Sequence, residues 1–378
     1  MALPLARGRI KERPEDFVVE EMPAYDPSGA GDHVYVRFTK TDRTTLDAVH
    51  AIARDLGCDP RAAGFAGMKD RRAVTTQTAS FQAPAGSTPV DLARRAQALS
   101  LPGICVHEAT PHGHKIKPGH LAGNRFTIVI REIPHERIGE VTHAFERIAL
   151  SGVPNVFGAQ RFGRRGDNAA RALAWLRGQE RGPRDRRVLR LLWSSLQSAV
   201  FNAVLDARVL DGTWTTPLEG DLLKLRSSGG LFVCSDVQKD GERAATGELS
   251  PTGPIFGARM RGAEGTPGQL ERRLTAEIVG ADVDLSRTRG LGEGSRRALR
   301  VWVEDLRWEL SEAPGDNSGN SAACVRVQFV LPKGAYATTV LGSALAIDEN
   351  HDDGHDRQPP QRDHLNPRPI QRRTLVRR

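Results

Sequence analysis

Two spacings of apolar residues alternate along the first third of the chain. In residues 33–40, HVYVRFTK, Val34, Val36 and Phe38 occupy every second position, which predicts a half-buried strand. Residues 44–57 change to a helical spacing, with Thr44 or Thr45 placed to cap the start of the helix and Gly57 to end it. Further β-rich runs lie at 17–19, 73–81 and 124–133. Strands mixed with helices, without a regular βαβ rhythm, indicate an α+β fold.

The pattern changes after residue 160. Residues 186–212 carry apolar side chains at four-residue spacing and predict one long amphipathic helix. A loop-rich stretch with short strand-like pieces covers 213–268, a second helix is predicted at 268–280, and β-type alternation returns at 323–342. A strand-rich start and end around a different middle indicate one domain interrupted by another. From residue 347 the chain has few apolar residues and four prolines, so we expect a disordered tail.

The distribution of charge indicates a polyanion as a candidate binding partner. The net charge is +8, and ten arginines fall within residues 161–190 against three acids, with six more in 359–378 against one acid. Arginine suits bidentate contacts with phosphate, and a concentrated basic patch is typical of a polyanion-binding protein. A solvated basic surface is the alternative at this stage.

Composition limits the cellular compartments in which we expect the protein. We find no apolar run of the ~20 residues that a membrane span needs, and residues 1–17 lack the apolar core of a signal peptide. The four cysteines are far apart and form no CxxC pair, which argues against a disulfide framework and a structural zinc site. We therefore expect a cytoplasmic protein without a membrane partner.

Several common motifs for nucleotide binding, nucleophilic catalysis and metal binding are missing from the sequence. The sequence has no GxxxxGK[ST] loop for a nucleotide and no GxSxG elbow for a serine nucleophile. One segment, 105–120, combines a cysteine with histidines, but its spacing matches no zinc pattern and two lysines would repel a cation. We expect no metal there, and instead a basic loop that contacts phosphate; the residues concerned are Cys105, His107, His112, His114, Lys115, Lys117 and His120.

One carboxylate remains, in residues 64–81, GFAGMKDRRAVTTQTASF. Asp70 follows two glycines and lies between Lys69 and the pair Arg71–Arg72. An aspartate is ionised at neutral pH, so it can act as a nucleophile without a base if a cation and a partly buried pocket orient it. The residues alone leave two interpretations open, a surface ion pair and a catalytic carboxylate.

Six sequence segments, taken together, favour the catalytic interpretation of Asp70. PEDFVVEE, GFAGMKDRRAVTTQ, GNRFTIVIR, GVPNVFGAQRFGRRGDNAARA, SPTGPIFG and FVLPKGAYATTVL occur in this order. The chain closely resembles the tRNA pseudouridine synthase D (TruD) family over residues 8 to about 341. The resemblance implies an α+β pseudouridine synthase catalytic domain with a mixed, largely antiparallel sheet, interrupted by an inserted α/β TRUD domain. We place the catalytic domain at 1–160 plus 307–347, the insertion at 161–306 and a disordered basic tail at 348–378.

The resemblance also implies an activity. The family isomerises uridine to pseudouridine in RNA, without cofactor or metal, and bacterial members act mainly on uridine 13 of tRNA. By motif, Asp70 is the catalytic aspartate, Lys11 the lysine beside it, Phe126 the aromatic side chain that stacks on the target base and Asn124 a residue of the same pocket. Arg71 is expected to contact a phosphate or a carboxylate. Whether the aspartate acts at C1′ of the ribose or at C6 of the ring stays open, and we expect a monomer.

Two other functions remain under consideration. A non-catalytic RNA-binding or RNA-folding protein could use the same scaffold, although the presence of Asp70, Lys11, Asn124 and Phe126 favours an enzyme. A metal-dependent RNA hydrolase would need paired carboxylates, which the sequence does not offer.

Overall fold

A computed structural model describes residues 5–281, 283–312 and 322–349. Within them, ten strands form one mixed sheet in the order β14-β15-β7-β2-β5-β3-β6, with β1 and β16 joined beside β7 and β4 beside β5. The pairs β2–β5 and β1–β16 are parallel, and the other pairs are antiparallel. The fold is α+β, as the sequence predicts. The strands of this sheet are β1 (Arg7–Ile10), β2 (Phe17–Pro23), β3 (His33–Thr41), β4 (Gly64–Phe65), β5 (Val74–Gln82), β6 (Ile104–His112), β7 (Leu121–Pro134), β14 (Glu304–Glu312), β15 (Ala322–Pro332) and β16 (Ala346–Glu349).

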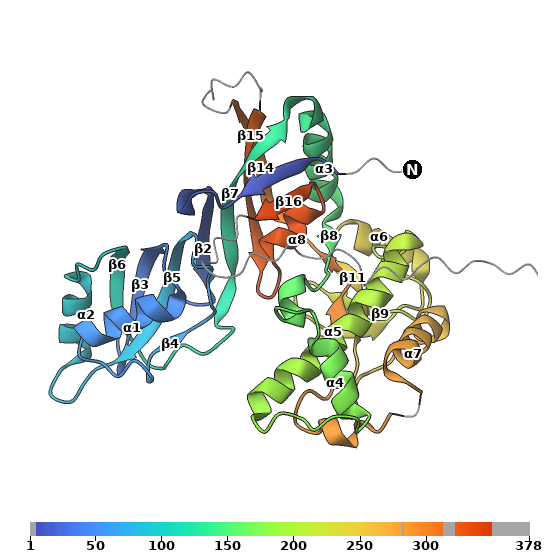
Figure 1. Ribbon diagram of the computed structural model, residues 1–378, viewed down its shortest axis with the longest axis horizontal. Coiled ribbons are helices and arrows are strands. Elements are labelled where there is room, and N and C mark those ends of the chain that lie inside the picture. Colours follow the sequence, from blue (N-terminus) through green and yellow to red (C-terminus); the bar gives the residue numbers. More distant parts are fainter. Residues whose placement is uncertain (1–4, 282, 313–321, 350–378) are drawn as a thin grey trace, which may run out of the picture.

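Helices pack on the sheet near each of its two ends, and each group of helices forms a hydrophobic core with the strands beneath it. At the left in Figure 1, α1 (Thr45–Asp55) and α2 (Pro89–Gln97) pack on β3, β5 and β6. At the other end, α3 (Ile138–Ser151) and α8 (Ala337–Gly342) pack on β7 and β15. Thr44 caps α1 by accepting a hydrogen bond from Asp47 N, and Gly57 has a φ of +70°, so both ends of α1 match the predicted signals. Short 3-10 turns lie at Pro14–Asp16 and His135–Arg137.

A smaller α/β unit lies at the lower right of Figure 1, between the short paired strands β8 (Val153–Pro154) and β13 (Arg300–Val301). Its antiparallel sheet has the order β10-β9-β11-β12. The unit contains η3 (Ala159–Phe162), α4 (Asn168–Leu176), α5 (Arg186–Leu210), β9 (Leu222–Leu225), β10 (Leu231–Val233), α6 (Val237–Ala245), β11 (Leu249–Ile255), α7 (Gly265–Val279), η4 (Leu285–Thr288) and β12 (Ser295–Ala298). The exact boundaries at 160 and 307 remain a prediction.

Four features differ from the sequence-based picture. The stretch 213–268 holds the sheet strands β9–β11 and helix α6 rather than mostly loop, and 337–342 is helical rather than strand. Strand β16 pairs with β1 as far as Glu349, so the first two residues assigned to the tail are strand; 350–378 lie outside the described residues.

The fourth difference concerns α5, which is long and apolar enough to cross a membrane by length and composition. Three of its four arginines lie in the first turns and Arg208 lies in the last turn, so an 18-residue stretch with at most two charged residues exists within the helix. Over that stretch 56% of the helix is buried inside the protein, against α4, α7 and β11. This is the packing of a core helix.

Candidate active site

A cleft of about 660 Å³ opens where β2 and β7 meet the turn that follows β15. Its walls come from segments far apart in the sequence: β2, residues 66–70, residues 119–126, Gln160 of η3, and residues 333–338. Gln160 brings the smaller unit to the edge of the cleft beside the large sheet. The volume lies within the ~300–1,000 Å³ of pockets that take small organic ligands, so the cleft can admit a nucleoside.

Asp70 lies in this cleft with a cation beside it. Lys11 Nζ is 2.9 Å from Asp70 Oδ2, and the lysine side chain is 11% exposed against 49% for the aspartate. The same ammonium lies 4.5 Å from the centre of the Phe17 ring. Lys11 has a φ of +59°, a left-handed conformation that costs a non-glycine residue ~1–3 kcal/mol and needs support from its surroundings. The buried lysine is therefore held in place and the half-exposed carboxylate faces the cleft.

A second lysine, Lys40, holds the backbone of the segment that carries Asp70, residues 66–70. Lys40, on β3, is fully buried and donates a hydrogen bond of 2.7 Å to the backbone oxygen of Asp70. Burial lowers the pKa of Lys40 to about 8, against the raising effects of Asp70 and Asp42. Thr45 of α1 accepts a 2.9 Å bond from Lys69 N. The loop is thus fixed through its backbone from two elements.

Lys69 points to the opposite side of the loop and orients an amide. Its Nζ lies 2.8 Å from Glu21 Oε2 and donates a 2.7 Å hydrogen bond to Asn124 Oδ1. Both members of the Glu21–Lys69 pair are almost fully buried, at 4% and 7% exposed. Because the amide oxygen of Asn124 accepts from Lys69, the amino group is the part of that side chain left to donate.

An aromatic group forms the apolar wall. Phe126 is 7% exposed, meets the edge of Phe17 at 6.2 Å between ring centres, and stacks on Phe329 at 5.4 Å. Phe126 and Phe17 both line the cleft. Phe126 is therefore part of the hydrophobic core and part of the cleft wall at once.

Comparisons with known proteins show the family of the chain. The family model described as tRNA pseudouridine synthase D (TruD) matches residues 2–180 and 184–343. The chain belongs to this family. The protein called tRNA pseudouridine synthase D in Anaeromyxobacter dehalogenans strain 2CP-1 is 42% identical over 90% of this chain and 93% of its own length. The protein of that name in Thermus thermophilus is 35% identical over 92% of this chain and 91% of its own length.

A solved structure shows the same fold. The crystal structure of a Methanosarcina mazei protein assigned to tRNA pseudouridine synthase D superposes with a TM-score of 0.71 and 23% identity, over 90% of this chain and 94% of that one. The mixed sheet with an interrupting α/β unit is therefore the fold of the TruD family.

The structure brings four of the five expected site residues together. Asp70, Asn124 and Phe126 line the cleft, and Lys11 contacts Asp70. Arg71 lies apart from them: its side chain is 71% exposed, and its Nε is 3.8 Å from Asp42 Oδ1. The carboxylate partner expected for Arg71 is thus Asp42, and its guanidinium remains open to solvent.

The structure also gives roles to the cations and glycines that flank Asp70 in the sequence. The cations next to Asp70 in the sequence serve other groups, since Lys69 pairs with Glu21 and Arg72 donates to Glu12 O at 2.6 Å. Gly64 is required by packing rather than by a ligand, because a Cβ there would lie 2.3 Å from Ile116 O. Gly67 alone of the two glycines lines the cleft, and a Cβ there would meet no other atom within 4 Å.

The histidines of residues 105–120 pack on one another and on tyrosines, and contact of this segment with phosphate stays a prediction. His112 and His114 approach each other to 3.2 Å between Nε2 atoms and pack against tyrosines, while His120 Nδ1 lies 2.6 Å from Tyr25 OH. Across the described ranges, no three His, Cys, Asp or Glu side chains form a group that could hold a metal ion.

Sequence reasoning missed Lys40, Glu21 and Phe329 as parts of the site. Lys40 and Glu21 are charged residues at inward positions of strands, and Phe329 faces Phe126 across the β7–β15 pair. A charged residue inside an apolar alternation was the available signal for the first two.

Proposed function

We propose that this chain isomerises uridine 13 of tRNA to pseudouridine, with Asp70 as the catalytic carboxylate and with no cofactor. Family membership makes the chain a pseudouridine synthase, an isomerase that acts on tRNA. The observation that carries the residue assignment is the Lys11–Asp70 pair at the wall of a nucleoside-sized cleft. The position within the tRNA is supported by the family likeness alone.

The reaction is balanced without a second reactant. The C1′–N1 bond of uridine breaks with its electron pair on N1, the uracil ring turns, C5 bonds to C1′, and the proton lost from C5 is replaced by one at N1. No electrons are gained or lost, so no redox group is needed. The Asp70 carboxylate supplies a negative charge at the reacting nucleoside, and Lys11 keeps that charge in place through a hydrogen bond.

The cleft has the groups that an extruded uridine needs. Flipping a base out of folded RNA costs a few kcal/mol, and stacking on an aromatic ring recovers ~1–3 kcal/mol. Phe126 and Phe17 offer that surface. Asn124, with its oxygen engaged by Lys69, offers an amide donor to a uracil carbonyl. Cytosine carries an amino group in place of the O4 carbonyl, so this donor favours uracil.

Arginines lie next to the cleft for the RNA backbone. The arginine-rich segment begins directly after Gln160, and Arg164 and Arg165 are exposed in the loop between η3 and α4. Some of its members have structural contacts instead, since Arg177 donates to Val279 O and Arg190 to Gly290 O. The exposed arginines nearest Gln160 are the ones that we assign to phosphate.

The test uses the full chain and an unmodified tRNA transcript with a uridine at position 13, with EDTA present and no cofactor added. Pseudouridine is mapped by carbodiimide-blocked primer extension. A single strong stop from position 13 is expected. A stop at another uridine would overturn the position while keeping the activity, and binding without any stop would favour the non-catalytic RNA-binding alternative.

A further inference from the structure

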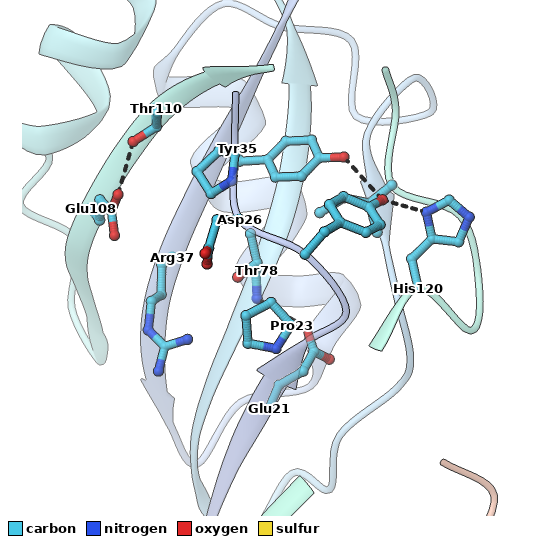
Figure 2. A pocket seen from close by; sticks show the side chains of 12 residues that line it. Glu21, Pro23, Asp26, Tyr35, Arg37, Thr78, Glu108, Thr110 and His120 are labelled. Atoms are coloured by element: carbon cyan, nitrogen blue, oxygen red, sulfur yellow. Dashed lines mark hydrogen bonds between the residues drawn. The ribbon is translucent and has the colours of Figure 1, made fainter. Parts of the chain in front are cut away.

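A second cavity, of about 190 Å³, lies beneath the loop that connects β2 to β3. Residues 23–27 form its roof, and the strands β3, β5 and β6 form its floor (Figure 2). The roof is anchored, because Tyr25 OH lies 2.6 Å from His120 Nδ1 and Gly29 N donates to Pro111 O. The cavity is thus a defined part of the fold, separate from the Asp70 cleft, and the isomerisation chemistry leaves it without a use.

Its size and walls suit a flat ring. The volume is below the ~300 Å³ where pockets for drug-sized ligands begin, so a single heterocyclic base fits better than a whole nucleotide. Tyr35, which is 6% exposed, and the rings of Pro23 and Pro27 provide flat apolar surfaces. A planar base can pack between such surfaces.

The polar side chains that line the cavity include both negatively and positively charged groups. Figure 2 shows the Asp26 carboxylate between the Tyr35 ring and the Arg37 guanidinium, with Glu108 opposite. Arg37 Nη2 donates to Glu20 at 2.6 Å, and Thr110 Oγ1 donates to Glu108 Oε1 at 2.9 Å, so both long side chains are oriented. Carboxylates outnumber cations among the lining residues, although the whole chain carries +8. Phosphate is therefore disfavoured here, and a group with N–H donors is favoured.

We propose that this cavity binds a guanine base of the RNA substrate. Guanine has two adjacent donors, N1–H and N2–H, that match a carboxylate such as Asp26 or Glu108. It also has two adjacent acceptors, O6 and N7, that match the guanidinium of Arg37, which is the commonest specific contact to guanine. Adenine and cytosine have one amino group and no ring N–H, and uracil has one ring N–H between two carbonyls, so none of them offers two adjacent donor groups together with two adjacent acceptors.

The position of the cavity connects it to the cleft. The segment 116–121 lines both, with Ile116 and His120 in the cavity and Gly119 and Leu121 in the cleft. The Glu21 carboxylate at the cavity wall pairs with Lys69 at the cleft wall. A guanine held here would therefore lie close to the flipped uridine in the folded RNA. The inference rests on the proposed function to the extent that RNA is the source of the base.

The first experiment measures nucleoside binding to the full chain by saturation-transfer NMR. Guanosine is expected to bind at least tenfold more tightly than inosine, which lacks the N2 amino group, and than adenosine, cytidine or uridine. The double variant Asp26→Asn/Glu108→Gln should lose this preference. Glu146→Gln, a carboxylate on the exposed face of α3, is the matched control and should keep it. Equal binding of all five nucleosides, or an unchanged preference in the double variant, would overturn the proposal.

The second experiment identifies the source of the base. A tRNA transcript containing 6-thioguanosine is irradiated with the protein, and crosslinked peptides are found by mass spectrometry. Crosslinks within residues 23–37 or 104–120 are expected, and their loss in the double variant confirms the cavity. Guanosine binding without such crosslinks would assign the cavity to a free nucleoside and overturn an RNA base. Pseudouridine is measured in the same samples with unmodified RNA, so a failure of the proposed function is detected separately.

Discussion

Lys11 Nζ lies 2.9 Å from Asp70 Oδ2, and the lysine is the more deeply buried member of the pair. A buried cation beside a half-exposed carboxylate fixes the position of the carboxylate at the wall of the cleft. Lys11 reaches this place from β1's end through a left-handed backbone conformation.

We predict that Lys11→Met lowers kcat for pseudouridine formation ~10- to 100-fold, since a hydrogen bond to a charged group contributes ~1.5–3 kcal/mol. Lys11→Arg keeps the charge and should recover part of the loss. Single-turnover rates on a tRNA transcript provide the measurement. Equal rates for the wild type and Lys11→Met would show that Asp70 needs no cationic partner.

Lys40 makes stability depend on pH. The folded-state pKa is about 8, below the unfolded value of 10.5, so between these two pH values the unfolded chain holds a proton that the folded chain has released. The free energy of unfolding of the wild type should therefore rise with pH across this window, by about 3 kcal/mol relative to Lys40→Met. Urea titrations of both proteins at pH 7.5, 9 and 10.5 measure the difference. A constant difference would show that Lys40 titrates normally.

Variants of Glu21 and Lys69 test whether the buried contacts among Glu21, Lys69 and Asn124 stabilise the fold and orient the amide. Either single variant, Glu21→Gln or Lys69→Met, leaves one buried charge without its partner and should cost ~3–5 kcal/mol of unfolding free energy. The double variant removes both charges and should be more stable than either single variant. It should still convert uridine slowly, because Asn124 loses the group that orients its amide. Additive destabilisation in the double variant would mean that the two side chains do not interact.

The arginines after Gln160 should determine part of the salt dependence of RNA binding. Replacing Arg164 and Arg165 by alanine should reduce the slope of log K against log salt by ~1.5, at ~0.7–0.9 per phosphate contact. Arg273→Ala on α7, whose guanidinium pairs with Glu277, serves as the control and should leave the slope unchanged. An equal effect of Arg273→Ala would show that the binding is spread over the whole basic surface.

Local patterns gave much of this structure. Strands β2, β3, β5 and β7 and helices α1 and α5 coincide with the predicted segments, because each has a clear period and, for α1, a cap at each end. Helix α6 was missed since VQKDGERAA buries only two residues, too few to show a helical period.

The candidate site was predictable only in part. Family motifs predicted Asp70, Lys11, Asn124 and Phe126 as site residues, whereas the cations next to Asp70 in the sequence did not by themselves show which lysine contacts its carboxylate. Which lysine meets the carboxylate depends on the register of β1, β2 and β5, which places Lys11 near Asp70 and turns Lys69 toward Glu21. These two contacts join residues 59 and 48 positions apart, and no local pattern specifies them.

The account rests on the Asp70 carboxylate, and the variant Asp70→Asn tests it with little change of volume. The variant is mixed in excess with an unmodified tRNA transcript, and pseudouridine and RNA affinity are both measured. We predict no detectable pseudouridine at any position, with a Kd for RNA close to that of the wild type. Conversion of uridine by Asp70→Asn at a rate near that of the wild type would contradict the account.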